Sequence, residues 1–60
     1  MYVEINRHTA EVGKPLSEAE LFARLAALTN PAFATTAVAA IKAGRSVELK
    51  HARFVQVEGG

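Results

Sequence analysis

The chain contains no cysteine, no aspartate and no tryptophan among its 60 residues. The absence of cysteine excludes disulfides, thiol nucleophiles and cysteine-type zinc sites, and it agrees with a cytoplasmic location, where thiols stay reduced. No apolar run is long enough to span a bilayer, and residues 1–4 lack the basic and apolar blocks of a signal peptide. The sequence therefore predicts one domain over residues 1–60, located in the cytoplasm and without a membrane partner.

An excess of charge of one sign is also lacking. Lysine and arginine number seven against six glutamates, so the formal net charge is +1. A near-neutral chain is neither a basic nucleic-acid tail nor an acidic DNA mimic. Half of the residues are hydrophobic, many of them alanine, which argues against disorder. A core of this size rarely supplies more than about 3–5 kcal/mol, and small proteins often gain stability from a second subunit.

The pattern predicts an α+β domain of order β-α-α-β-β, with an antiparallel sheet of two or three strands and two helices packed on one face. Residues 2–9 alternate and are rich in strand formers, and Val3 and Ile5 are expected to face the core. Residues 10–15 contain Gly and Pro and are expected to form a loop.

The first helix has the strongest local signal in the chain. Ser17 and Glu20 have the spacing of a capping box, which predicts a helix over about residues 18–29. Its core stripe recurs at helical spacing and is flanked by an aromatic residue. The stripe consists of Leu21, Leu25 and Leu28, with Phe22 beside it.

The second helix is marked at both ends and carries no charge in its middle. Asn30 suits the N-cap, Pro31 suits the first helical position, and Gly44 suits the left-handed residue that closes a helix. Between Ala32 and Ile41 the only polar side chains are two threonines. A helix that is apolar all round is usually covered on more than one side, so a second chain is expected to cover it.

The C-terminal part predicts strand structure over residues 46–58. Val47, Leu49, Val55 and Val57 share one parity, as a half-buried strand requires. His51 and Arg53 interrupt that parity, which favours two strands joined by a break; one bent strand is the alternative, because no tight-turn signal is present. Residues 58–60 are expected to be frayed.

One stretch resembles known DNA-binding proteins. The run 41–49, followed by Val55 and Val57, looks like the helix-end and strand pattern of HU/IHF-type DNA-bending proteins. It is also similar to the last helix and first wing strand of Cro-like repressors. The resemblance covers the C-terminal third and implies a small dimeric DNA-binding protein. No functional residue is carried over from either family.

The titratable residues offer few sites. Four cations of the C-terminal part form a candidate phosphate-binding stretch, namely Lys42, Arg45, Lys50 and Arg53. A solvated strand face is the alternative. His8 and His51 are expected to approach one another if the terminal strands pair, and Glu11 or Glu48 would then be needed to complete a metal site. That spacing matches no known motif, so no metal, cofactor or catalytic residue is assigned.

The apolar helix is interpreted as an interface, because small uncharged side chains let another chain approach closely. Ordinary core packing is the alternative. The contact residues expected from this interpretation are Phe33, Thr35, Thr36, Ala37, Val38 and Ile41.

The sequence thus favours a non-enzymatic binding protein that uses the helix over residues 31–43. The expected partners are a second copy, in a homodimer, and another protein. Stand-alone domains of this size are typical of inhibitors and accessory factors encoded by phages and mobile elements. The second hypothesis is a small dimeric HU- or Cro-like DNA-binding protein that uses the stretch 42–53.

Overall fold

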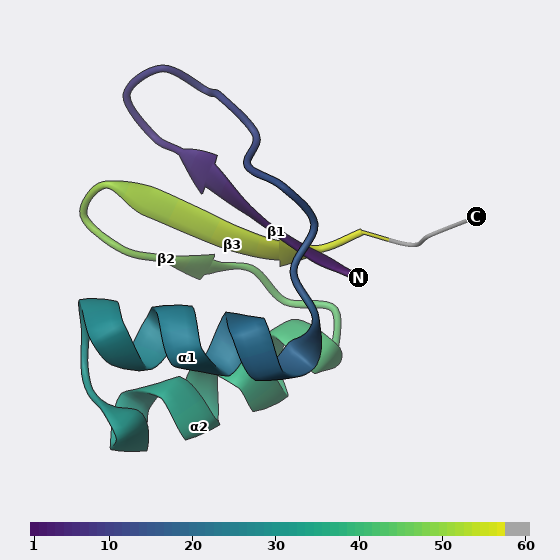
Figure 1. Cartoon of the computed structure of the whole chain (residues 1–60), viewed down its shortest axis with the longest axis vertical. Coiled ribbons are helices and arrows are strands. Elements are labelled where there is room, and N and C mark those ends of the chain that lie inside the picture. The colour runs from purple at the N-terminus through teal and green to yellow at the C-terminus, as the bar shows by residue number, and fades with distance from the viewer. Residues whose placement is uncertain (58–60) are drawn as a thin grey trace.

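The computed structural model, which describes residues 1–57, has the predicted element order β-α-α-β-β (Figure 1). The elements are β1 (Tyr2–Asn6), α1 (Glu18–Leu28), α2 (Pro31–Lys42), β2 (Val47–Glu48) and β3 (Ala52–Gln56). The end expected to be frayed, 58–60, lies outside the described residues. Within residues 1–57, neither helix has the length and apolar character needed to cross a membrane.

The strand that comes last in the chain lies in the middle of the sheet, whose order is β1-β3-β2. β3 pairs antiparallel with β1, which places Val3 opposite Val55 and Glu4 opposite Phe54. It also pairs antiparallel with β2, where Val47 lies opposite Phe54. The C-terminal stretch is therefore a hairpin of two strands, and the alternative of one bent strand is excluded.

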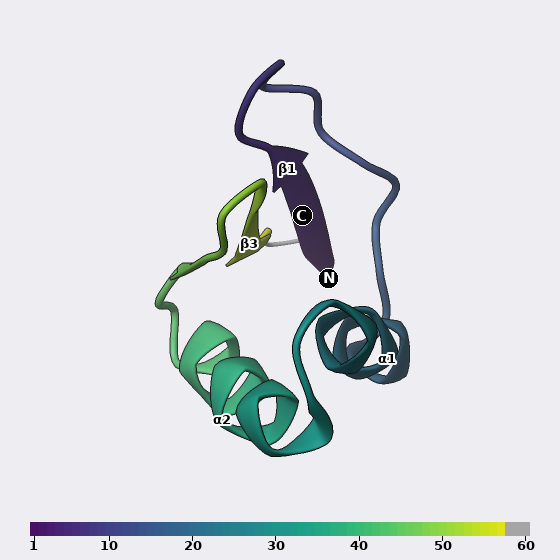
Figure 2. The ribbon, with the colours of Figure 1, turned by 90° about the vertical axis from the view of Figure 1, so that its left-hand side faces the viewer.

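Both helices lie on one side of the sheet, next to each other (Figures 1 and 2). In Figure 1 the chain runs through α1 from right to left and returns through α2 from left to right. The salt bridge between Glu18 at the start of α1 and Lys42 at the end of α2, 3.0 Å long, fits this antiparallel arrangement. The two helices therefore form an αα-hairpin, in which α2 lies at an angle to α1 (Figure 2).

The ends of both helices have the predicted caps. The Ser17 hydroxyl accepts a hydrogen bond from the Glu20 backbone N–H at 3.2 Å, and the Glu20 carboxylate accepts one from the Ser17 N–H at 3.1 Å. The Asn30 side chain accepts from the Phe33 N–H at 2.8 Å. Gly44 has a φ of +91° and closes α2. The sequence therefore encodes the beginning and end of its helices locally.

Replacement of Ser17 by alanine should lower the free energy of unfolding by about 1 kcal/mol, since one helix donor loses its partner. The hydrogen bonds from Ser17 hold the pKa of the Glu20 carboxyl below its usual range. A carboxyl with a lowered folded-state pKa stabilises the fold above its unfolded-state pKa and loses that effect as the pH falls through the folded value. The alanine variant keeps the backbone N–H, which is the larger cause, and loses only the part due to the hydroxyl. Urea unfolding of both proteins at neutral and acidic pH should therefore show a slightly smaller difference in acid, and a larger difference in acid would contradict this account.

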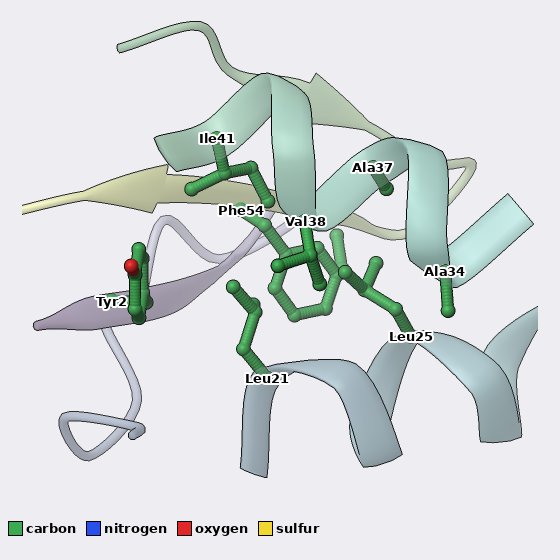
Figure 3. Close-up of a cluster of buried hydrophobic side chains, with 9 residues drawn as sticks. Tyr2, Leu21, Leu25, Ala34, Ala37, Val38, Ile41 and Phe54 are labelled. Carbon is green, nitrogen blue, oxygen red and sulfur yellow. The ribbon is translucent and has the colours of Figure 1, made fainter. Parts of the chain in front are cut away.

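A cluster of buried side chains fills the space between the helices and the sheet (Figure 3). The ring of Phe54 lies at its centre and is completely buried, with Leu21, Leu25 and Val38 around it. The full cluster is Tyr2, Leu21, Leu25, Ala34, Ala37, Val38, Ile41, Ala52 and Phe54. Every element except the short β2 contributes to it, and Val47 of β2 packs against its side.

The prediction that Val3 is buried is confirmed, since it is 6 % exposed, but the face of β1 that points to the helices is that of Tyr2. Tyr2 belongs to the buried cluster, whereas Val3 does not. Glu4, on the same face as Tyr2, reaches α1 and pairs with Arg24 at 2.8 Å. The register explains the difference, because Phe54 sets the inner face of β3 and the residue opposite it, Glu4, must share that face.

Two further expectations about the core need correction. Leu28, expected in the stripe of α1, is 45 % exposed because the helix ends there, beyond the edge of the cluster. Ala37, Val38 and Ile41 were expected to contact a second chain, but α1 and the sheet bury all three within this chain. Burial of α2 against α1 and the sheet of the same chain thus explains why much of this helix is apolar.

Candidate functional site

The face of the sheet turned away from the helices carries an apolar surface, which we call the open face. Side chains alternate between the two faces of a strand, so Val3 and Ile5 of β1 and Val55 of β3 lie opposite to the core side. The bridge between Ile5 and Val12 adds Val12 to the same face. Met1 and Val57 continue the alternation. The open face comprises Met1, Val3, Ile5, Val12, Val55 and Val57.

Exposure on the open face rises from its middle to its rim. Val3 is buried by its neighbours, and Ile5 and Val55 are half-buried. Val12, Met1 and Val57 at the rim are 62 %, 54 % and 39 % exposed. These three are half of the exposed large hydrophobic side chains among residues 1–57. The apolar side chains of the open face thus form one continuous surface, exposed at its rim.

Both edges of the sheet are closed to the addition of another strand. On the β1 side, the segment before α1 runs antiparallel to the strand, with bridges Tyr2–Leu16 and Ile5–Val12. Tyr2 and Leu16 exchange both backbone hydrogen bonds, at 3.1 and 2.7 Å. On the other side, β2 has only two residues and so presents a short edge. These short or partly covered edges favour packing on the face of the sheet over extension of its ladder.

The charged side chains in the strands of the open face neutralise each other. Glu48 of β2 lies opposite Arg53 of β3, and their side chains form a salt bridge. Arg53 in turn lies opposite Ile5 of β1, which places the ion pair beside the apolar surface. The face thus combines an apolar part with one internally paired charge couple and needs no charged partner for it.

The predicted phosphate-binding residues do not lie together. Lys42 ends α2, where its ammonium donates to the carboxylate of Glu18, and this contact raises the pKa of Lys42. Arg45 follows in the connection to β2, at the end of the sheet where β2 begins. Lys50 lies in the turn between β2 and β3, at the opposite end (Figure 1). With Arg53 paired to Glu48, the stretch offers separate cations rather than one basic patch.

The two histidines do meet, as the sequence predicts for paired terminal strands. The Nε2 atom of His8 and the Nδ1 atom of His51 are 2.6 Å apart, and the ring centroids are 4.9 Å apart. His8 lies in the loop after β1, and His51 lies in the turn before β3. Neither Glu11 nor Glu48 completes a metal site, because residues 1–57 hold no group of three potential ligands.

A shallow hollow of about 330 Å³ lies near this end of the sheet. Its lining residues are Ile5, Asn6, Arg7, Ala10 and Arg53. Arg7 donates from Nη1 to the Leu49 carbonyl oxygen at 2.7 Å, and Arg53 is paired with Glu48. The arginines therefore have structural partners, and the hollow brings no nucleophile and base together.

Sequence reasoning missed the open face because it placed Val3, Ile5, Val55 and Val57 in the core. The sequence did contain a signal for the open face, since β1 and β3 carry apolar residues on both of their faces. Tyr2 and Phe54 lie on one face, and Val3 and Val55 lie on the other. Strands of this kind are covered on both sides. Comparisons of this chain with protein-family models, curated proteins and solved structures find no match.

Proposed function

We propose that this protein is a non-enzymatic binding protein that acts through the open face, and that its first partner is a second copy of the same chain. The proposal rests on the observation that both helices lie on the same side of the sheet. Two helices cover the inner face of the sheet, and six apolar side chains lie on the other face, of which Val3 alone is buried. Covering that face removes apolar surface from water, which is the main driving force of association.

A second copy fits the open face in charge as well as in polarity. The strands carry the Glu48–Arg53 pair on this face, so the face needs no cationic or anionic partner. In a two-fold dimer the same patch meets itself, and an internally neutral patch can do so without like-charge repulsion. The closed edges favour face-to-face packing over a continuous sheet through both copies.

The dimer is expected to be weak. The longest extent, 27 Å, runs from the helices to the sheet (Figure 1), so the remaining extents of 26 and 17 Å limit a flat contact on the open face to about 440 Å² on each copy, well below the roughly 800 Å² of a standard interface. Area alone does not fix the affinity, but a contact of this size is typical of weak, transient association. The oligomeric state must therefore be measured over a range of concentrations rather than at one.

The test is the molar mass in solution, from light scattering across a dilution series, of the unmodified protein and of Val55→Glu. The unmodified protein should approach twice the 6.4 kDa of the monomer at high concentration. Val55→Glu should weaken association by roughly 100-fold or more, because two carboxylates would face each other in an apolar contact. Val55 is half-buried outside the core cluster, so the helical circular dichroism signal should persist.

Phe33→Glu is the matched control, since Phe33 is an exposed apolar residue of α2, on the opposite layer. It should leave the dimer intact. Loss of the dimer in Phe33→Glu but not in Val55→Glu would move the interface to α2, as the sequence interpretation has it. A monomer at millimolar concentration would overturn the proposal of a second copy.

Duplex DNA is the weaker proposal, because the cations of the stretch 42–53 are divided between two ends of the sheet. The one feature that still favours DNA binding is the cationic turn between β2 and β3, where Lys50 precedes His51. A role as an inhibitor or accessory factor would require a further partner of the dimer. Binding to duplex DNA that weakens steeply with salt would favour the DNA proposal over a purely protein-binding role.

A further inference from the structure

The two histidines are the only residues of the chain whose side chains are strong ligands for transition metals. The sequence has two histidines and no cysteine. Both lie at the surface, and their facing nitrogens, His8 Nε2 and His51 Nδ1, are 2.6 Å apart. They are 43 positions apart in the sequence, so the fold itself brings them together. Neither ring contributes to the core cluster.

The backbone around the histidines is held in place from both sides. The Arg7 backbone N–H donates to the His51 carbonyl oxygen at 3.1 Å, and its side chain donates to the Leu49 carbonyl oxygen. The Asn6 side chain accepts from the backbone N–H groups of His8 and Thr9, at 2.8 and 3.1 Å. The loop and the turn are thus joined next to the two rings, which pre-organises the pair.

The two nitrogens are closer together than in a chelate. Nitrogens at about 2.0 Å from one ion lie roughly 2.8 Å apart at a right angle and roughly 3.3 Å apart at a tetrahedral angle. The 2.6 Å between the nitrogens is that of a hydrogen bond along the line between the two rings, so both exposed rings must turn before their nitrogens converge on one ion. Right-angled, planar coordination by nitrogen is typical of Cu²⁺ and Ni²⁺, whereas Zn²⁺ favours the tetrahedron.

We propose that His8 and His51 form a bidentate surface site for a divalent transition metal, with Cu²⁺ preferred over Zn²⁺. Binding replaces the hydrogen bond between the rings by two metal–nitrogen bonds, and any proton shared by the two nitrogens leaves to solvent. Water fills the other coordination positions, because residues 1–57 provide no third ligand in the group.

The ligand type, rather than the charge nearby, sets the selectivity of the site. Arg7, Lys50 and Arg53 lie in the same loops and strands and repel every divalent ion alike, although Arg7 donates to a carbonyl oxygen and Arg53 is paired with Glu48. Imidazole nitrogens disfavour Mg²⁺ and Ca²⁺, which require carboxylate and carbonyl oxygens. Among the first-row divalent ions, Cu²⁺ binds imidazole most tightly, so this pair of ligands favours Cu²⁺.

The test is a calorimetric titration of the full chain with Cu²⁺, Zn²⁺ and Mg²⁺ in a non-coordinating buffer. Cu²⁺ should bind one equivalent per chain, Zn²⁺ more weakly, and Mg²⁺ not at all. His8→Gln and His51→Gln should each weaken Cu²⁺ binding by about 100-fold, because the second imidazole acts at high effective concentration. Lys50→Gln is the matched control next to His51 and should not weaken it.

Two outcomes would overturn the proposal. Equal Cu²⁺ affinity in the unmodified protein and both histidine variants would place any binding elsewhere, for example at the N-terminal amine of Met1. Equal affinity for Mg²⁺ and Cu²⁺ would indicate an unselective charge effect. Nuclear magnetic resonance of the unmodified protein gives a second readout, since substoichiometric Cu²⁺ should broaden the signals of His8 and His51 before others.

Discussion

Phe54→Ala should unfold the protein at room temperature. Phe54 is completely buried at the centre of the core cluster, between both helices and the neighbouring strands. Replacing a buried phenylalanine by alanine costs about 3–5 kcal/mol. That is as much as a single core of this size usually supplies. The variant should therefore lose its cooperative thermal transition in circular dichroism and its dispersed amide signals.

Phe33→Ala is the control for this change, because it removes the same side chain from an exposed position of α2. Its cost should stay below about 1 kcal/mol, since surface substitutions have small effects. Both variants lose the same aromatic ring, so the difference between their free energies of unfolding reports the effect of burial. A folded Phe54→Ala variant with nearly unchanged stability would contradict the position of Phe54 in the core.

The second large effect is expected for Val38→Glu. Val38 lies in the middle of α2 and is buried against α1 and the sheet. A glutamate at this position would bury an unpaired carboxylate, which costs several kcal/mol and exceeds the expected stability. The variant should be unfolded in circular dichroism at all concentrations, and the light-scattering signal should show no compact species.

Ala39→Glu is the matched control, since Ala39 is the next residue of the same helix and is exposed. It introduces the same charge into the same helix and should leave both fold and association unchanged. The pair separates two descriptions of α2. If Val38→Glu stayed folded and lost only its association, Val38 would be an interface residue, as the sequence interpretation expects, and the core assignment would be wrong.

The elements of this fold were predictable because their signals are local. Ser17 with Glu20 marks the start of α1, and Asn30 and Gly44 mark the ends of α2, through hydrogen bonds between near neighbours. Such signals do not depend on what the rest of the chain does. The approach of His8 to His51 was also predictable, because it follows from pairing the first strand with the last.

The orientation of the strands could not be predicted in the same way. β1 and β3 carry apolar residues on both faces, so alternation alone does not say whether Tyr2 or Val3 faces the helices. That choice depends on the register between strands about 50 positions apart and on the volume of Phe54 in the core. We therefore propose the open face, rather than α2, as the interface, because Ala37, Val38 and Ile41 of α2 are buried within the chain.

The sheet's strand order also has a mechanical consequence. The Val57 backbone N–H donates to the Met1 carbonyl oxygen at 2.9 Å, so the outer ends of β1 and β3 are neighbours. The hydrogen bonds between antiparallel strands lie perpendicular to the strands. A force applied between Met1 and Val57 would therefore load these bonds one after another, like opening a zipper, and the sheet should yield at low force from that end.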